Sequence, residues 1–447
     1  MQRKTFIRIG ATIAAGSVVK PLTSWSQTAR LKNWAGNVTY STGNVQYPKS
    51  VTEVQQLVKK LDKLKTLGTR HCFNTIADSN RDLVSTRDLN KVVSLDTKAK
   101  TVTVESGIKY GELAPYLHKH GYALANLASL PHISVGGSIT TATHGSGIKN
   151  GNLSSAVNGL EVVTADGSVV NFSKHKDAST LNAVTVGLGA IGVITKVTLD
   201  VIPTFMVRQR VFTNMLLAQV KQNFEKIVSA GYSVSLFTNW VNDNVSEVWI
   251  KSRTDEKDHT EAEFYGAKAA TKNLHPVIAQ SAEKCTDQMG VPGIWYERLP
   301  HFKMGFTPST GKELQSEYFV PLQHAVEAIS AISRLGKQIS PHLFITEIRT
   351  IAADELWMSP CYRQTSVTIH FTWKPETAAV MKLLPIIDRE LAPFNARPHW
   401  GKVFTMSPKT IASRYAKLDD FKKIAATYDP KGKFRNAFLD KNIFSVI

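Results

Sequence analysis

The chain has 447 residues, 43% of them hydrophobic and 20% charged, with a formal net charge of +18. These proportions are ordinary for a soluble globular protein. The chain is too long for one ordinary core, so two domains, or one domain with a large insertion, are expected. The basic residues are scattered and form no nucleic-acid recognition motif, so a basic, solubilising surface is preferred and a nucleic-acid binder is the least favoured class.

The N-terminus has the features of an export signal. A cationic head, MQRKTFIR, precedes an apolar run over residues 9–19 that is too short to span a bilayer. Cleavage after Ser26 would remove a signal peptide of residues 1–26, and an uncleaved interfacial anchor is the alternative. RKTFIR resembles a weakened twin-arginine signal with Lys4 in place of the second arginine, which leaves the export route open. We expect an exported, periplasmic or secreted protein with no stable membrane span.

The N-terminal half alternates between helical and strand patterns. The segment from Ser50 to Glu53 is a capping box, and apolar residues follow it at helical spacing up to Leu64. The next loop, LGTRHC, puts His71 at the end of a tight turn. Later patterns predict strands over 91–95 and 101–105, a helix over 110–120 that ends at Gly121, a hairpin over 160–172 that turns at Asp166-Gly167, and a strand that ends at Pro203.

The pattern of predicted elements changes near residue 204, where longer helices and aromatic-rich strands begin. We therefore predict a first domain over 33–203, a second over 204–398 and a C-terminal segment over 399–447. The GLGAIG run at 187–192 has the wrong spacing for a Rossmann site and precedes a strand rather than a helix. Its glycines are better explained by close packing beside a cofactor.

A second loop, residues 128–147, is rich in Gly, Ser and Thr. Such small residues let backbone N–H groups approach a ligand closely. Together with the His71 loop, this segment predicts a cradle for a large phosphorylated cofactor with an imidazole at its edge. A bound flavin is the group that fits this arrangement.

Alternation in two later strands predicts a polar face. Glu347 and Arg349 are two residues apart, as are His370 and Thr372, so each pair projects from one side of its strand. Carboxylate, guanidinium and hydroxyl groups on one face could bind a polar ligand. The competing interpretation is an exposed salt bridge between Glu347 and Arg349.

The cysteines exclude a disulfide framework. Cys72, Cys285 and Cys361 allow at most one bridge, and whether the last two pair is open. None has metal-ligand spacing, and no metal site is expected.

Nine strings carry a resemblance that covers nearly the whole chain. In order they are NWAGN, the HxFN string at His71, ASLPHISVGGS, THGSG, YERLPHF, ELQSEY, EIRT, HFTW and ARPHWGKVF. The chain resembles the vanillyl-alcohol-oxidase type of FAD-linked oxidases, and within it the alditol oxidases. The resemblance implies an α+β protein: a two-subdomain FAD-binding domain and a substrate domain built on an antiparallel sheet flanked by helices.

The resemblance also implies how FAD is held. His71 matches the histidine that the family links covalently to the flavin, and the absence of a cysteine from 128–147 implies a single attachment. The other implied cofactor-binding residues are Leu67, Gly68, Thr69, Arg70, Cys72, Phe73, Ser129, Ser134, Gly137, Ser138, Thr143, His144, Gly145, Ser146, Val193 and His399.

The implied substrate-binding residues are Ser129, Glu347, Arg349, Thr372 and Lys402, of which Lys402, Arg349 and Glu347 are the implied catalytic residues. The implied reaction is oxidation of an alditol by O2, with Lys402 or His399 as the proton acceptor. A sugar-lactone dehydrogenase of the same fold and a noncatalytic flavin- or carbohydrate-binding protein are the alternatives. A monomer is expected.

Overall fold

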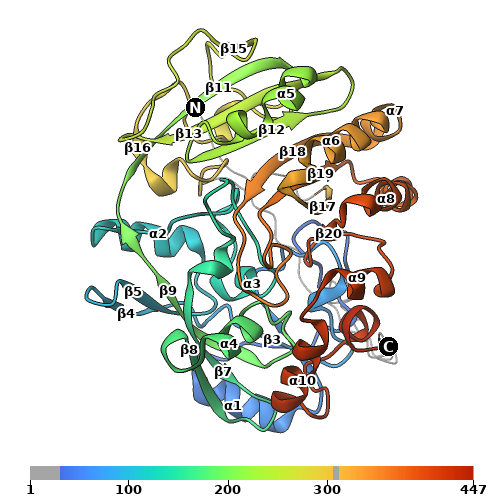
Figure 1. The fold of residues 1–447 in the computed structure, drawn as a ribbon. Helices are drawn as coiled ribbons and strands as arrows, with labels where there is room; N and C mark the ends of the chain where they lie inside the picture. The colour runs from blue at the N-terminus through green and yellow to red at the C-terminus, as the bar shows by residue number, and fades with distance from the viewer. Residues whose placement is uncertain (1–30, 306–311, 446–447) are drawn as a thin grey trace, which may run out of the picture.

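The computed structural model describes residues 31–305 and 312–445, and the predicted signal peptide lies outside them. Two bodies of secondary structure lie one above the other in Figure 1. The lower one is built mainly from the first 200 residues, and the upper one is a large sheet with its helices. The mixture of helices with largely antiparallel sheets confirms the α+β class.

The lower body contains two main sheets. Its helices are α1 (Val51–Lys60), α2 (Tyr110–Lys119), α3 (Val135–Ile139) and α4 (Lys174–Thr185). Parallel strands in the order β1 (Val45–Gln46), β3 (Asp82–Ser85), β2 (Leu64–Leu67) form the first sheet. Antiparallel strands in the order β4 (Val92–Asp96), β5 (Thr101–Glu105), β9 (Val193–Asp200), β7 (Val157–Val163), β8 (Val169–Ser173) form the second. A short pair, β6 (Tyr122–Ala123) and β10 (Ile202–Pro203), lies beside them.

The upper body is one ten-stranded sheet whose paired strands are antiparallel. Its order is β14 (Glu263–Phe264), β15 (Ala267–Ala269), β11 (Met206–Leu216), β13 (Asn244–Arg253), β12 (Ser233–Thr238), β18 (Leu343–Ile351), β19 (Ser366–Trp373), β17 (Leu314–Pro321), β20 (Arg397–Pro398), with β16 (Gly293–Ile294) on β11. The accompanying helices are α5 (Leu217–Val228), α6 (Ala325–Arg334), α7 (Gly336–Ile339) and α8 (Thr377–Leu391).

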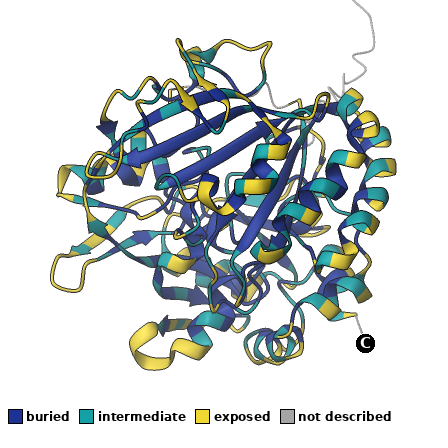
Figure 2. Ribbon diagram, turned by 45° about the horizontal axis from the view of Figure 1, so that its top comes forward, coloured by how far each residue is buried: buried dark blue, intermediate teal, exposed yellow. Residues whose placement is uncertain are grey.

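Helices α5 and α6 cover one face of this sheet, and α8 packs on α6. Residues such as Leu236, Ile250 and Ile369 point into that apolar layer. Because side chains alternate along a strand, the intervening residues point to the opposite face, toward the lower body. The central strands are almost fully buried in Figure 2, so both faces are covered.

The chain returns to the lower body after the large sheet. Helices α9 (Pro408–Arg414), α10 (Leu418–Tyr428) and α11 (Ala437–Leu439) form this C-terminal segment. The fully buried amine of Lys65 joins it to the rest, because Nζ donates to the carbonyls of Leu188, Gly189 and Phe434. One lysine thus ties the GLGAIG turn and the C-terminal segment to β2.

Most predicted elements are confirmed. Ser50 Oγ accepts the Glu53 N–H at 3.2 Å, as a capping box requires, and Gly167 turns the β7–β8 hairpin at a φ of 81°. One expectation was wrong: the first helix does not extend to Leu64. Leu61 is its C-cap, and Leu64 begins β2, so the His71 loop follows a strand. Within 31–305 and 312–445, no helix has both the length and the apolar character needed to cross a membrane.

Candidate active site

A cavity of about 470 Å³ lies between the loops of the lower body and the face of the large sheet opposite α5 and α6. Most of the predicted site residues line it. These are Leu67, Gly68, Thr69, Arg70, His71, Cys72, Phe73, Ser129, Gly137, Ser138, Thr143, His144, Glu347, Arg349, Thr372, His399 and Lys402.

The first loop presents His71 at the wall of the cavity. Arg70 turns the chain with a φ of 63°, a conformation that is costly for a residue with a side chain. The His71 ring stacks on Trp34 with 5.2 Å between centroids, and its Nδ1 lies 3.0 Å from Thr69 Oγ1. Burial lowers the pKa of His71 to about 4, helped by nearby His132. The imidazole is therefore neutral near pH 7 and keeps one ring nitrogen with a lone pair.

The second loop lies against the first at two glycines. A Cβ on Gly68 would fall 2.8 Å from Ser134 Oγ and 3.6 Å from the Cα of Gly137. Ser134 Oγ is buried and has no hydrogen-bond partner within the described residues. Gly68 and Gly137 line the cavity and have no side chains to keep a ligand from the backbone, which suits a phosphate-bearing ligand such as FAD. The residues present therefore fit this cofactor.

The C-terminal segment contributes Lys402 to the same cavity. Asn74 of the first loop fixes its position, because Nδ2 donates to the carbonyls of Trp400 at 2.8 Å and Lys402 at 2.7 Å. The Phe73 N–H donates to the Gly401 carbonyl at 2.7 Å. The HxFN string therefore serves two purposes: it presents His71 and it anchors the segment that carries Lys402.

The sheet contributes a row of charged residues that strand register brings together. Glu347 on β18 pairs with His370 on β19, which pairs with Glu317 on β17. All three side chains point away from α5 and α6. Since Glu347 and Arg349 are 6% and 4% exposed, the interpretation of this pair as a surface salt bridge is wrong.

Glu317 is the centre of this ion-pair network. Its Oε1 accepts from Arg349 Nη2 at 2.8 Å and its Oε2 accepts from Lys402 Nζ at 2.6 Å. Burial alone would raise the pKa of the Glu317 carboxyl, but Lys402, His144 and Arg349 hold it well below its usual range. Glu317 is therefore a buried anion that holds two cations beside the cavity.

Both cations keep further donors for a ligand. Arg349 Nε is buried and makes no hydrogen bond to the described residues, although it lies 3.5 Å from Glu347 Oε1. Arg349 Nη1 reaches Ser129 Oγ at 3.5 Å, which joins the sheet to the second loop. Burial lowers the pKa of the Lys402 amine, and Glu317 opposes the shift. A fraction of Lys402 is thus neutral at a lower pH than an ordinary lysine would be.

Two histidines beside Lys402 have defined hydrogen-bond roles. His370 Nδ1 accepts from Lys402 Nζ, so its Nε2–H donates to Thr372 Oγ1 at 3.1 Å. The Thr372 hydroxyl proton is then free to point into the cavity. His399 Nδ1 accepts the Gly401 N–H at 3.0 Å, which puts the proton of the neutral ring on Nε2. His399 therefore has no free lone pair and is the weaker of the two predicted proton acceptors.

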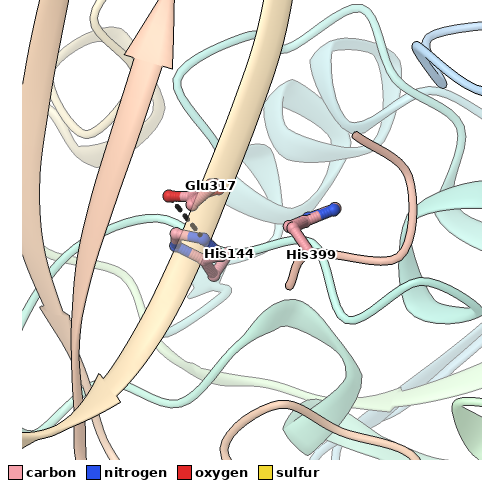
Figure 3. Close-up of side chains that lie close together, drawn as sticks. All are labelled: His144, Glu317 and His399. Carbon is pink, nitrogen blue, oxygen red and sulfur yellow. Dashed lines mark ion pairs between the residues drawn. The ribbon is translucent and has the colours of Figure 1, made fainter. Parts of the chain in front are cut away.

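His144 and His399 lie close to Glu317, as Figure 3 shows. Their ligating atoms lie within 4.8 Å of one another, and His144 Nε2 is 3.2 Å from Glu317 Oε1. Three such groups resemble a metal-ligand set. However, Arg349 and Lys402 already neutralise the only carboxylate, so a metal cation would be repelled at this position.

Four predicted cofactor residues do not line the cavity. Val193 points into a second apolar cluster with Phe434, because its neighbours Gly192 and Ile194 occupy the cavity side of β9. Ser146 Oγ donates to the Val234 carbonyl. Ser134 and Gly145 stand behind the lining residues, and a Cβ on Gly145 would fall 2.2 Å from the Leu127 carbonyl oxygen.

Sequence reasoning missed Glu317, although it read the ELQSEY string that contains it. Gln315 and Glu317 alternate along β17 as Glu347 and Arg349 do along β18, so the same period-two argument would have found it. The three cysteines are free, and Cys285 and Cys361 lie in separate apolar clusters.

Comparisons with known proteins agree with this geometry. Residues 44–173 match the model of the FAD binding domain, which covers both loops of the cavity wall. Residues 304–442 match the model of the D-arabinono-1,4-lactone oxidase family, which covers Glu317, Glu347, Arg349 and Lys402.

Relatives and solved structures extend over nearly the whole chain. An alditol oxidase of Streptomyces sp. is 45% identical over 91% of this chain and 97% of its own. An L-gulonolactone oxidase of Mus musculus is 26% identical over 92% of this chain and 98% of its own. The crystal structure of a cholesterol oxidase from B. sterolicum superimposes with a TM-score of 0.76 at 14% identity, covering 93% of this chain and 96% of that one, and so shares the fold.

Proposed function

Since this chain belongs to the alditol oxidase family of FAD-linked oxidases, we propose that it oxidises the terminal hydroxymethyl group of an alditol, such as xylitol or sorbitol, to the aldose. O2 is reduced to hydrogen peroxide. The observation that carries this proposal is the meeting of Glu347, Arg349 and Lys402 at one cavity whose other wall holds His71.

The loops of the lower body would hold FAD. Gly68 and Gly137 line the cavity without side chains, and the second loop supplies hydroxyls and backbone amides. When bound, FAD supplies the hydride acceptor and the means of passing electrons to O2. The cofactor is assigned on these residues and on the family model that matches 44–173.

A covalent link through His71 is the finer part of this proposal. Its neutral, buried imidazole keeps a nucleophilic nitrogen, and Trp34 fixes the ring plane. Acid precipitation tests it: the yellow colour should stay with the polypeptide. Colour released entirely into the supernatant would disprove the link.

The polar row would bind the substrate hydroxyls. Glu347 is an acceptor, because burial would raise the pKa of its carboxyl but Arg349, His301 and His370 hold it below the usual range. Thr372 is directed as a donor by His370. A polyol carries only hydroxyls, so a site that pairs fixed acceptors with fixed donors selects it over apolar alcohols.

Lys402 is the proposed proton acceptor. Its neutral fraction can take the hydroxyl proton at Nζ, which Glu317 Oε2 and His370 Nδ1 then hold by hydrogen bonds. Arg349 stabilises the alkoxide charge that develops, a contribution of roughly 3 kcal/mol for one well-placed donor.

Anaerobic mixing with polyols tests the activity. Xylitol or sorbitol should bleach the flavin absorbance, and admitting O2 should restore it with production of peroxide. A matched pair of variants tests whether Lys402 is needed for substrate oxidation. Lys402→Met should abolish bleaching, whereas Lys409→Met, on α9 outside the cavity lining, should not change it. Absence of bleaching with every polyol would overturn the proposal.

A sugar-lactone dehydrogenase is the second candidate. The lactone-oxidase family model over 304–442, which includes Lys402, supports a lactone as substrate, and a relative at 26% identity is an L-gulono-1,4-lactone dehydrogenase. Lactones should then bleach the flavin faster than polyols do, and artificial acceptors should reoxidise it faster than O2.

We also propose that the protein is exported, on the cationic head and apolar run of residues 1–26. The supporting result would be a periplasmic or secreted protein whose N-terminal residue is Gln27.

A further inference from the structure

Two buried polar side chains adjoin Glu347: His301, which also lines the cavity, and Lys251, which does not. His301 Nε2 lies 2.7 Å from Glu347 Oε1. His301 Nδ1 in turn lies 3.1 Å from the amine of Lys251, a β13 residue that is 1% exposed. The reaction described above does not use Lys251, and it uses His301 only as one of the groups that keep the Glu347 carboxyl ionised.

The hydrogen bonds around His301 fix which atom carries each proton. Lys251 Nζ donates to the carbonyls of Leu299 at 2.6 Å and Pro300 at 3.0 Å. Burial lowers the pKa of Lys251 to about 7, so near pH 7 its ammonium form, which donates to His301 Nδ1, coexists with the neutral amine. The Glu347 carboxylate can only accept, so His301 Nε2 is the donor of that pair. A nitrogen that accepts a proton donor carries none in the neutral ring. His301 therefore holds its proton on Nε2, where it donates to Glu347.

The surroundings favour a neutral His301. Burial lowers the pKa of His301 to about 4, and Lys251 adds to the shift while Glu347 opposes it. Phe237 and Trp249 pack edge-on against the ring at centroid distances of 5.7 and 5.2 Å. The ring can therefore neither tilt nor gain a second proton easily.

The orientation of Glu347 follows from these contacts. Within the described residues, its contacts with His301 Nε2 and Arg349 Nε both fall on Oε1. Oε2 is thus the oxygen left for a ligand in the cavity. The backbone N–H of His301 also donates to the Ser129 carbonyl at 3.2 Å, so the turn that Lys251 braces contacts the second loop as well.

We propose that Lys251 and His301 are positioning residues that act in series to hold Glu347 with Oε2 toward the substrate hydroxyl. Lys251 fixes the turn at 299–301 and the tautomer of His301, and His301 fixes the carboxylate. This inference rests on the proposed function only in that Glu347 binds a substrate hydroxyl.

A double-mutant cycle on the FAD-loaded enzyme tests the serial order. Lys251→Met should raise the KM for xylitol about fivefold and His301→Leu more than tenfold, each with kcat changed less than threefold, since an interaction made with bound substrate is lost. In the His301→Leu background, Lys251→Met should raise KM by much less than fivefold, because the part of its effect that passes through the imidazole is already lost. His301→Gln should recover part of the affinity, since its amide can still donate to Glu347.

His259 provides the matched control. It is equally buried and bridges Glu261 and the Ala230 carbonyl, but it does not line the cavity. His259→Gln should leave KM unchanged, even if the melting temperature falls. Additive effects of the two substitutions on KM, or losses confined to kcat, would overturn the serial order.

A second measurement needs no substrate. In protein labelled with ¹⁵N-histidine, the ring resonances of His301 can be assigned because they disappear in His301→Gln. They should show a neutral ring that is protonated at Nε2. A ring protonated at Nδ1 would overturn the inference. If the wild-type enzyme oxidises no polyol, the proposed function is wrong. The His301 tautomer can still be measured in that case, and it tests the positioning of Glu347 separately.

Discussion

The two walls of the cavity are built on different principles. The loop wall consists of glycines, hydroxyls and backbone amides that are adjacent in sequence, as at Gly68 and in residues 128–147. The sheet wall consists of charged side chains from three strands, which only register brings together. A cofactor common to many relatives needs shape and backbone, whereas a substrate needs charges at fixed positions. Substitutions in the sheet wall should therefore impair substrate oxidation, and substitutions in the loop wall should impair flavin binding.

Removing Arg349 should break the sheet wall alone. Arg349→Met leaves Glu317 and Glu347 without their shared cation, and kcat/KM for a polyol should fall by about 100- to 1000-fold, or roughly 3–4 kcal/mol. Flavin content should stay at the wild-type level. Arg363→Met, which alters an exposed pair with Glu355, is the control and should change neither quantity. Loss of flavin together with activity would show that the walls are not separable.

Acid should destabilise the protein through the sheet wall. Burial, with Lys402, lowers the pKa of His370 to about 4, against an ordinary value of 6.5. Between these values the unfolded state binds more protons, so stability is lost as pH falls from 6.5 toward 4, by about 2 kcal/mol for one histidine. Urea unfolding at pH 6.5 and 4.5 should show a smaller loss for His370→Gln than for the wild type. Equal losses would mean that His370 is not held neutral.

A methyl group should break the loop wall alone. The new Cβ in Gly68→Ala meets Ser134 Oγ and the backbone of Gly137, and flavin affinity should fall about tenfold, ~1.4 kcal/mol. Gly43→Ala is the control, since a Cβ added there would have no neighbour within 4 Å. Equilibrium binding of FAD to protein stripped of cofactor measures both. If the histidyl link prevents stripping, the flavin-to-protein ratio after expression replaces it.

The smallest expected effect sharpens the role assigned to the sheet wall. Thr372→Val removes the hydroxyl that His370 directs toward the cavity, and KM for a polyol should rise about fivefold, ~1 kcal/mol. Thr372→Ser should restore most of the loss. A Ser variant as impaired as the Val variant would place the effect in packing rather than in the hydroxyl.

The difference between the walls also explains what the sequence could predict. The helices α1 and α2, the β7–β8 hairpin and both loops follow from local patterns, and they were found. Alternation placed Glu347 beside Arg349 without knowledge of the fold. The neighbours of that pair, Glu317 and His301, come from segments far along the chain, and no local pattern states that β17 lies next to β19 rather than elsewhere in the sheet.

Burial was likewise beyond local patterns. Lys251 sits in a strand of apolar and polar residues, EVWIKSR, that gives no sign of a fully enclosed amine. Only the packing of the 299–301 turn against β13 supplies its three acceptors. The extent of the first helix was misjudged for a related reason: Leu64 fits the helical period, but its strand partners on β3 decide its conformation.

Asn74 and Lys65 anchor the last segment of the chain, so the cavity can be completed only late in synthesis. Lys402 is translated long after His71. Asn74 can donate to the Lys402 carbonyl, and Lys65 to the Phe434 carbonyl, only after those residues have left the ribosome. A ribosome-bound nascent chain can therefore complete its lower sheets while the reactive centre stays open to water. A chain that ended before residue 399 would have the loop cradle but lack Lys402, so the cavity can be complete only when nearly the whole chain has been made.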